Sequence, residues 1–467
     1  MNCRFVLVWG TLLGLMANTA FAVDPILQWN STYRAVVQGN STQANPGWST
    51  RSMAILNGSL YDINQAFTPT HSQYLYQGSA PGGASQDAAL AEAARVALLD
   101  CYPDQAALIT ADYNTRMATI NANNSPAAVA AGTAFGAQVA QSYINWRTND
   151  GASVNVPYTP TNLPGRWSSD PTRPGTQEAW GPGWGAVKTF TLNSSTQFTV
   201  PGVPPLNSQA YTDSYNEVKA KGAATGSTRT ADETDIGIFW GYDRQGMGPP
   251  PVLYNANLDD IATQQNNTLG QNARLFALAS VAMADAAIAA WDVKFVDDFW
   301  RPITGIREGD NDGNPNTAGD PNWVPLGAPG STDPMNNQAA NFTPPFPAYV
   351  SGHATMGAAT YEVLRQFYGT DTMNYTLYSA ESMPSGLHTR NYTSFSQAEY
   401  ENAYSRIYLG IHWSFDAIDG ISLGNDVADH VYNNFRPIPE PSTWVLLGLA
   451  GAGTIAWRLR RKVLGGR

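Results

Sequence analysis

The sequence predicts an all-α protein made of two helical-bundle halves that are joined by long irregular loops. Three observations support this fold class. Apolar residues recur at helical spacing in several segments, no series of alternating, strand-like segments is present, and the intervening segments are rich in Gly, Pro and aromatic residues. With 467 residues, the chain is long enough for one large or two packed domains.

The expected helices form two groups along the chain. The first group covers residues 84–99, 103–120 and 126–146, and the second covers residues 258–295, 353–368, 397–409 and 416–435. Ser125 and Pro126 supply an N-cap and a first helical residue. The stretch 275–290 is apolar nearly all round, which predicts a helix that is buried on every side.

Irregular segments separate these helices. Residues 23–80 are a polar opening, residues 150–255 are rich in Pro, Gly, Trp, Tyr and Asn, and residues 307–347 are rich in Asp, Asn, Gly and Pro. Long irregular segments in compact proteins are usually functional or tightly packed. The many aromatic residues favour wrapping over disorder.

The two ends of the sequence predict export. Arg4 followed by the apolar stretch 5–16 and Ala20-Phe21-Ala22 is typical of a signal peptide. Near the C-terminus, Pro439-Glu440-Pro441 precedes an apolar stretch, 444–457, and a basic flank. This arrangement resembles the PEP-CTERM sorting signal of Gram-negative bacteria, which an exosortase-type membrane protease processes; a plain membrane anchor is the alternative.

The boundaries follow from these features. We expect a signal peptide (1–22), an N-terminal helical half with wrapping loops (23–255), a C-terminal helical domain (256–436) and a sorting anchor with a short transmembrane segment (437–467). The body of the protein would then be periplasmic, cell-surface or extracellular. Because Cys3 leaves with the signal peptide, only Cys101 remains and no internal disulfide is expected.

Charge limits the partners. The net charge of −11 argues against a nucleic-acid partner, because phosphate backbones require a basic surface. A small anionic substrate remains compatible, since a few local cations can outweigh a diffuse negative field.

Three short motifs in the C-terminal half carry the candidate chemistry. In the first, Lys294 and Arg301 are seven residues apart at the end of the apolar helix, with Pro302 expected to disrupt it. Two helical turns would place both cations on one face. A cation beside apolar surface is costly unless an anion meets it; a solvated helix end with bridges to Asp297 and Asp298 is the alternative.

The second motif is Ser351-Gly352-His353 at the start of a helix. Ser351 stands at an N-cap position, and Gly352 permits close backbone approach to a ligand. Free N–H groups and the helix dipole make such a start suitable for an anion, and His353 could exchange a proton with it. On its own, this pattern is more often a capped helix.

The third motif contains Arg406, His412 and Asp416. Gly410 suits a helix C-terminus and would turn the chain so that His412 lies beside Arg406. Asp416 can accept a hydrogen bond from the far nitrogen of His412, which would fix its tautomer and leave the other nitrogen as ligand or nucleophile. A structural His–Asp pair is the alternative for this motif alone, but all three motifs together favour an oxyanion pocket.

With these motifs, the sequence resembles the vanadium-dependent haloperoxidase and type 2 phosphatidic acid phosphatase superfamily, over roughly residues 85–436. The resemblance implies a vanadium chloroperoxidase-like fold and a vanadate cofactor for which phosphate competes. Lys294, Arg301 and Arg406 would neutralise the oxyanion, and Ser351 and Gly352 would hydrogen-bond it. His412 would be the metal ligand, oriented by Asp416, and His353 the acid–base group.

The resemblance further implies that hydrogen peroxide and a halide are the substrates and hypohalous acid the product. Phe346 resembles chloroperoxidases at a position where bromoperoxidases typically carry His. Val350 departs from the usual Pro-Ser-Gly-His pattern, which leaves halide preference and turnover less certain. Two alternatives remain: a soluble acid phosphatase that uses His412 as nucleophile on a phosphate ester, and an inactive surface or matrix protein.

Overall fold

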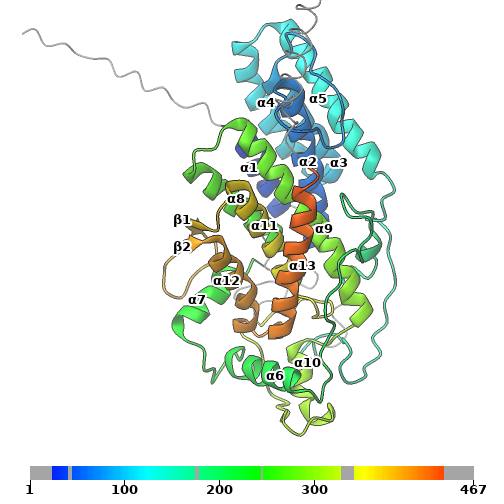
Figure 1. Ribbon diagram of the computed structural model, residues 1–467, viewed down its shortest axis with the longest axis vertical. Helices are drawn as coiled ribbons and strands as arrows, with labels where there is room; N and C mark the ends of the chain where they lie inside the picture. The colour runs from blue at the N-terminus through cyan, green and yellow to red at the C-terminus, as the bar shows by residue number, and fades with distance from the viewer. Residues whose placement is uncertain (1–23, 40–44, 174–177, 243–245, 328–340, 436–467) are drawn as a thin grey trace, which may run out of the picture.

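The computed structural model describes residues 24–39, 45–173, 178–242, 246–327 and 341–435 (Figure 1). The described chain is mostly helical. Its helices are α1 (Pro25–Gly39), α2 (Pro46–Phe67), α3 (Gln86–Cys101), α4 (Ala106–Asn123), α5 (Pro126–Arg147), α6 (Gln209–Lys221), α7 (Ala231–Phe239), α8 (Pro250–Gln264), α9 (Leu269–Asp297), α10 (Pro302–Arg307), α11 (Gly352–Tyr368), α12 (Phe395–Tyr408) and α13 (Ser414–Tyr432). The all-α prediction is therefore confirmed.

The N-terminal helices gather at one end of the molecule. In Figure 1, α2 to α5 form its upper part, while α6, α10 and α12 lie toward the lower end. Helix α3 packs against α2, α4 and α5. Gly132 and Gly136 of α5 lie directly against the backbone carbonyls of Ser85 and Ala89, so the two helices approach without intervening side chains.

Helix α9 links the two halves. It packs against α2 on the N-terminal side and against α11 and α13 on the C-terminal side, and buried side chains from both halves form one continuous apolar core. Thr268 and Gln271 form a capping box at its start. The prediction of a helix buried on every side is confirmed, because each residue from 275 to 290 is buried.

A membrane role for α9 finds no support in its surroundings. Within the described residues it is the one helix with the length and hydropathy of a membrane span, and its apolar window is completely buried inside the protein. It is therefore the core helix of the fold. The signal-peptide prediction (1–22) and the predicted anchor (437–467) lie outside the described residues.

Several elements differ from the sequence prediction. The polar opening contains two full helices, α1 and α2, and the Gly- and Trp-rich segment contains α6 and α7. The continuous pattern at 258–295 is interrupted at 265–268, where α8 ends and α9 begins. A small antiparallel sheet, β1 (Thr372–Tyr378) with β2 (Thr389–Ser394), was not predicted.

The irregular segment after α5 is fixed to α9 by a buried carboxylate. Asp285 accepts hydrogen bonds from the backbone N–H groups of Phe190 (2.6 Å), Thr191 (2.7 Å) and Leu192 (3.2 Å), and from the Thr191 hydroxyl (2.7 Å). Burial nevertheless raises the pKa of Asp285. The segment is thus packed against the core as a wrapping loop.

Replacing Asp285 by asparagine should destabilise the protein by about 2–4 kcal/mol, because an amide keeps one acceptor oxygen and turns its NH₂ group toward buried donors. Urea unfolding followed by circular dichroism measures this difference. A variant that unfolds at the wild-type urea concentration would show that the carboxylate does not hold the loop.

Candidate oxyanion-binding site

Lys294 lies in the last turn of α9 and is completely buried. Its Nζ donates hydrogen bonds to the carbonyl oxygens of Pro347 (2.9 Å), Ala348 (2.9 Å) and Val350 (2.5 Å). Three acceptors match the three protons of an ammonium group. Lys294 therefore fixes the segment that leads into α11 and contributes positive charge next to it.

Arg301 lies outside α9. The helix ends at Asp297, the left-handed Asp298 (φ 52°) reverses the chain, and Arg301 becomes the N-cap residue of α10 with Pro302 as its first residue. The prediction that both cations share one helix face, and that Pro302 disrupts this helix, is wrong. Pro302 starts a helix, as proline at the first position commonly does.

Lys294 and Arg301 nevertheless converge on the same segment. Arg301 Nε donates to the Phe346 carbonyl (2.8 Å), and its Nη1 donates to the Ile411 carbonyl (2.8 Å) and lies 2.9 Å from His412 Nε2. The alternative of bridges from these cations to Asp297 and Asp298 does not occur within the described residues; Asp298 instead accepts a hydrogen bond from Tyr158 (2.5 Å).

Ser351 is the N-cap residue of α11, as predicted, and accepts a hydrogen bond from the Ala354 amide (3.3 Å). The space beside Gly352 is filled by the Trp291 ring, 2.8 Å from where a Cβ would stand. Glycine is therefore required here for the packing of Trp291 against the helix start. The Ser351 amide donates to the Asp416 carbonyl (2.9 Å), which joins the second motif to the third.

His353 is buried in the first turn of α11, and neither ring nitrogen has a hydrogen-bond partner in the described part of the chain. Its backbone carbonyl accepts from the hydroxyl of Tyr254 (2.8 Å) and from Asn402 Nδ2 (3.2 Å). Unpartnered buried nitrogens are costly, so this imidazole has the features of a group that meets a ligand. Tyr254 and Asn402 were not predicted from the sequence, because single polar residues within helices carry no local signal of such a contact.

The third motif folds largely as the sequence predicts. Helix α12 ends at Tyr408, and Gly410 (φ 74°) turns the chain in a conformation that favours glycine. His412 Nδ1 lies 2.9 Å from Asp416 Oδ2, and both side chains are buried. Because Arg301 can only donate, Nε2 is the acceptor and Nδ1 carries the proton given to Asp416.

Positive charge and burial govern the protonation of the site. Burial and the nearby Arg301 lower the pKa of Lys294 well below its usual value, and burial followed by Arg406 does the same for His353. Burial and the surrounding cations also lower the pKa of His412. Both imidazoles are therefore neutral at pH 7, and an anion entering the site would be favoured by the three cations.

Aromatic rings close one side of the site. The Phe346 ring centroid lies 5.2 Å from Lys294 Nζ and 4.9 Å from Arg301 Cζ. Trp180 and Trp291 lie edge to face with centroids 5.1 Å apart, and each also contacts Phe346. Trp180 comes from the wrapping loop, which therefore supplies part of the wall around the buried cations.

These residues fit an oxyanion such as vanadate or phosphate. Three buried cations (Lys294, Arg301 and Arg406) carry compensating positive charge, His412 Nε2 is an acceptor, and both nitrogens of His353 lack partners among the described residues. Histidine is a common ligand of metal centres. Of the described residues, no group of three or more His, Cys, Asp and Glu is placed to hold a metal ion.

Comparison with known proteins agrees with this geometry. Residues 274–440 match the model of the vanadium chloroperoxidase second helical-bundle domain, and residues 437–462 match the PEP-CTERM protein-sorting motif. A crystal structure of a bacterial vanadium-dependent iodoperoxidase superposes with a TM-score of 0.74 at 23% identity, covering 89% of this chain and 97% of that one. The chain has the vanadium haloperoxidase fold.

One further solved structure and one sequence relative agree with this result. A holo-type bacterial vanadium-dependent chloroperoxidase superposes with a TM-score of 0.65 at 16% identity, covering 85% of this chain and 94% of that one. The vanadium chloroperoxidase of Curvularia inaequalis is 35% identical over 266 residues, which cover 46% of this chain. The match spans 42% of the length of that relative. The resemblance to the vanadium haloperoxidases is thus confirmed, and the sorting motif indicates an exported protein.

Proposed function

We propose that the protein is a vanadium-dependent haloperoxidase that oxidises a halide with hydrogen peroxide to hypohalous acid. The observation that carries the proposal is the state of His412. Its Nδ1 proton is held by Asp416, and its Nε2 lone pair faces the buried cation Arg301. This is the tautomer needed for a nitrogen ligand to the metal of a bound vanadate.

Each residue has a defined role in this proposal. Arg301 and Arg406 would neutralise the oxyanion together with the charge of Lys294, while the start of α11, with Ser351 and Gly352, supports it. Bound vanadate would act as a Lewis acid that activates peroxide toward the halide. His353, neutral and with both nitrogens unpartnered in the described chain, would accept a proton from incoming peroxide and return it to the product.

Electrostatic preorganisation explains why these roles suit a buried site. The cations are held in place by backbone carbonyls before any ligand enters, as the three bonds of Lys294 illustrate. Fixed donors in a water-poor site stabilise developing charge more strongly than mobile ones. Trp180, Trp291 and Phe346 would keep the site dry, and the aromatic Phe346 is consistent with the chloroperoxidase-like pocket proposed from the sequence.

Adding vanadate to purified, vanadate-free protein should switch on peroxide-dependent halogenation of a halide-trapping dye. Activity should rise by at least about 100-fold, because the oxyanion supplies the chemistry that the side chains lack. Phosphate should suppress the gain by competition for the same cations. If vanadate-loaded protein is inactive toward halides but cleaves p-nitrophenyl phosphate, the phosphatase alternative is correct. Absence of both activities would favour an inactive surface or matrix protein.

We further propose that the protein acts outside the inner membrane, in the periplasm, at the cell surface or in the medium. The PEP-CTERM motif supports export and processing by an exosortase-type enzyme. The apolar stretch 444–457 would hold the chain in the membrane until that processing.

A further inference from the structure

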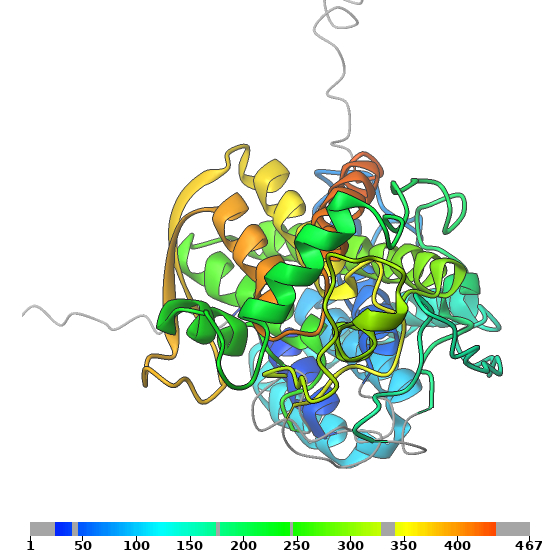
Figure 2. The ribbon, with the colours of Figure 1, turned by 90° about the horizontal axis from the view of Figure 1, so that it is seen from below.

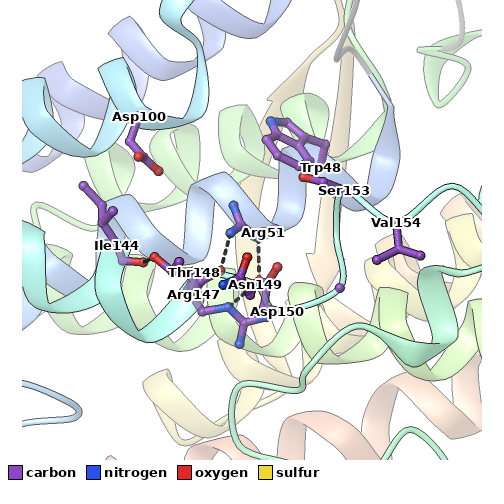
Figure 3. A pocket seen from close by; sticks show the side chains of 11 residues that line it. Trp48, Arg51, Asp100, Ile144, Arg147, Thr148, Asn149, Asp150, Ser153 and Val154 are labelled. Atoms are coloured by element: carbon purple, nitrogen blue, oxygen red, sulfur yellow. Dashed lines mark hydrogen bonds and ion pairs between the residues drawn. The ribbon is translucent and has the colours of Figure 1, made fainter.

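A cavity of about 390 Å³ lies in the N-terminal half, and none of its lining residues belongs to the oxyanion site (Figure 3). It is formed where the start of α2 meets the ends of α3 and α5 and the segment after α5. Figure 2 shows the same N-terminal helices from below.

One wall of the cavity carries buried positive charge. Asp150 Oδ2 accepts hydrogen bonds from the Nε atoms of both Arg51 (2.7 Å) and Arg147 (2.8 Å). Two guanidinium groups thus share one carboxylate on this wall, while the other carboxylate of the cavity, Asp100, lies elsewhere in its lining. Because buried charge is costly unless it is matched, this wall favours an anion.

Arg51 offers a donor for that anion. Its Nε binds Asp150 and its Nη2 binds the Arg147 carbonyl (3.0 Å), while its Nη1 has no hydrogen-bond partner among the described residues. The guanidinium of Arg147 is occupied by Asp150 and by the carbonyls of Lys188 and Thr189. Arg51 is therefore the group that can bind a ligand, and Arg147 supports it.

Three further polar side chains line the cavity without a hydrogen bond to any described residue: Asp100, Asn149 and Ser153. In Figure 3, Asp100 lies on one side of Arg51, and Ser153 lies on the other with Trp48 and Val154. Asp100 forms no ion pair with Arg51 in this structure, although that cation opposes the rise that burial causes in its pKa. One space is thus lined by an acceptor (Asp100), by two groups that can both donate and accept hydrogen bonds (Asn149 and Ser153), and by a cationic donor (Arg51).

We propose that this cavity binds a small hydroxylated carboxylic acid of the sugar-acid class. The carboxylate would accept from Arg51 Nη1 and from the Asn149 amide, and a hydroxyl at the other end would donate to Asp100. A neutral sugar would offer Arg51 Nη1 no carboxylate acceptor, and a dianion would place a second negative charge near Asp100. Apolar ring faces would contact Trp48 and Val154, as in other sites that combine apolar walls with few polar groups.

Isothermal titration of the full chain with sodium D-glucuronate tests the proposal, in excess vanadate so that the oxyanion site is occupied. Glucuronate should bind once per chain with a Kd below about 1 mM. D-Glucose, which lacks the carboxylate, and acetate, which lacks the hydroxyls, should each bind at least about tenfold more weakly, because each leaves a charged partner without its hydrogen bond.

Two variants locate the binding. Asn149 has a φ of 58°, so Asn149→Gly removes its amide while suiting the backbone; Asp100→Ala removes an exposed carboxylate. Each should weaken glucuronate binding about tenfold, with halide oxidation unchanged, whereas Asn123→Ala at the exposed end of α4 should change neither. Absence of binding up to about 10 mM glucuronate, or unchanged binding in both pocket variants, would refute the proposal. Neither outcome depends on whether the protein is a haloperoxidase.

Discussion

Replacing His412 by alanine should abolish vanadate binding and lower peroxide-dependent halide oxidation by more than about 100-fold. Its Nε2 is the one acceptor nitrogen that we assign to the cofactor, and its partner Asp416 is buried with it. Loss of a group that only hydrogen-bonds to a metal ligand and orients it commonly costs about 10–100-fold in metal affinity. Loss of the ligand itself should therefore cost more. Vanadium NMR measures binding, and the dye assay measures turnover.

The matched control is His71→Ala, which removes a partly exposed histidine that lies far from the three motifs in the sequence. This control should retain vanadate affinity and activity. Thermal unfolding of both variants separates loss of ligand from loss of fold. If the His412 variant, folded, binds vanadate as the wild type does, our assignment of the ligand is incorrect.

A single methyl group at Gly424 should produce a large loss of stability. Gly424 of α13 lies against α11, and an added Cβ would overlap the Thr355 carbonyl and stand 2.8 Å from the Ala358 Cβ. Backbone cannot yield as a flexible side chain can, so Gly424→Ala should cost about 3 kcal/mol. This loss should appear although alanine is the better helix former by about 1 kcal/mol.

Gly270→Ala supplies the comparison, because a Cβ at Gly270 of α9 meets one atom, Asn64 Nδ2, at an ordinary 3.5 Å. It should leave stability unchanged or slightly increased. Urea unfolding of both variants gives the two free energies. Equal values for Gly424→Ala and Gly270→Ala would mean that α13 can move away from α11 without cost.

The sequence was most informative where one local rule determined the structure. The cap at Ser351, the turn at Gly410 and the pairing of His412 with Asp416 each depend on neighbours within a few residues, and the structure has all three. The buried helix α9 was equally predictable from the sequence, because a segment that is apolar on all sides admits few other interpretations.

Other features depended on contacts that no local pattern encodes. Helices α1 and α2 were missed because polar residues such as Asn30 and Asn57 weaken the apolar pattern, although in the fold they hydrogen-bond each other in the core (2.8 Å). The carbonyl oxygens that accept hydrogen bonds from Lys294 belong to residues more than fifty positions further along the chain, so local spacing could not predict them. The position of Arg301 depended on the left-handed turn at Asp298, which sequence spacing alone does not reveal.

Helix α9, which belongs to both halves, has a consequence for how the molecule loses its structure. It packs against α2, and its last turn places Lys294 against the segment that leads into α11. Neither half can open without exposing a face of this apolar helix to water, so the two halves should melt in one cooperative transition. A destabilising substitution far from the cations, for example in α2, would then lower the activity by reducing the fraction of folded molecules.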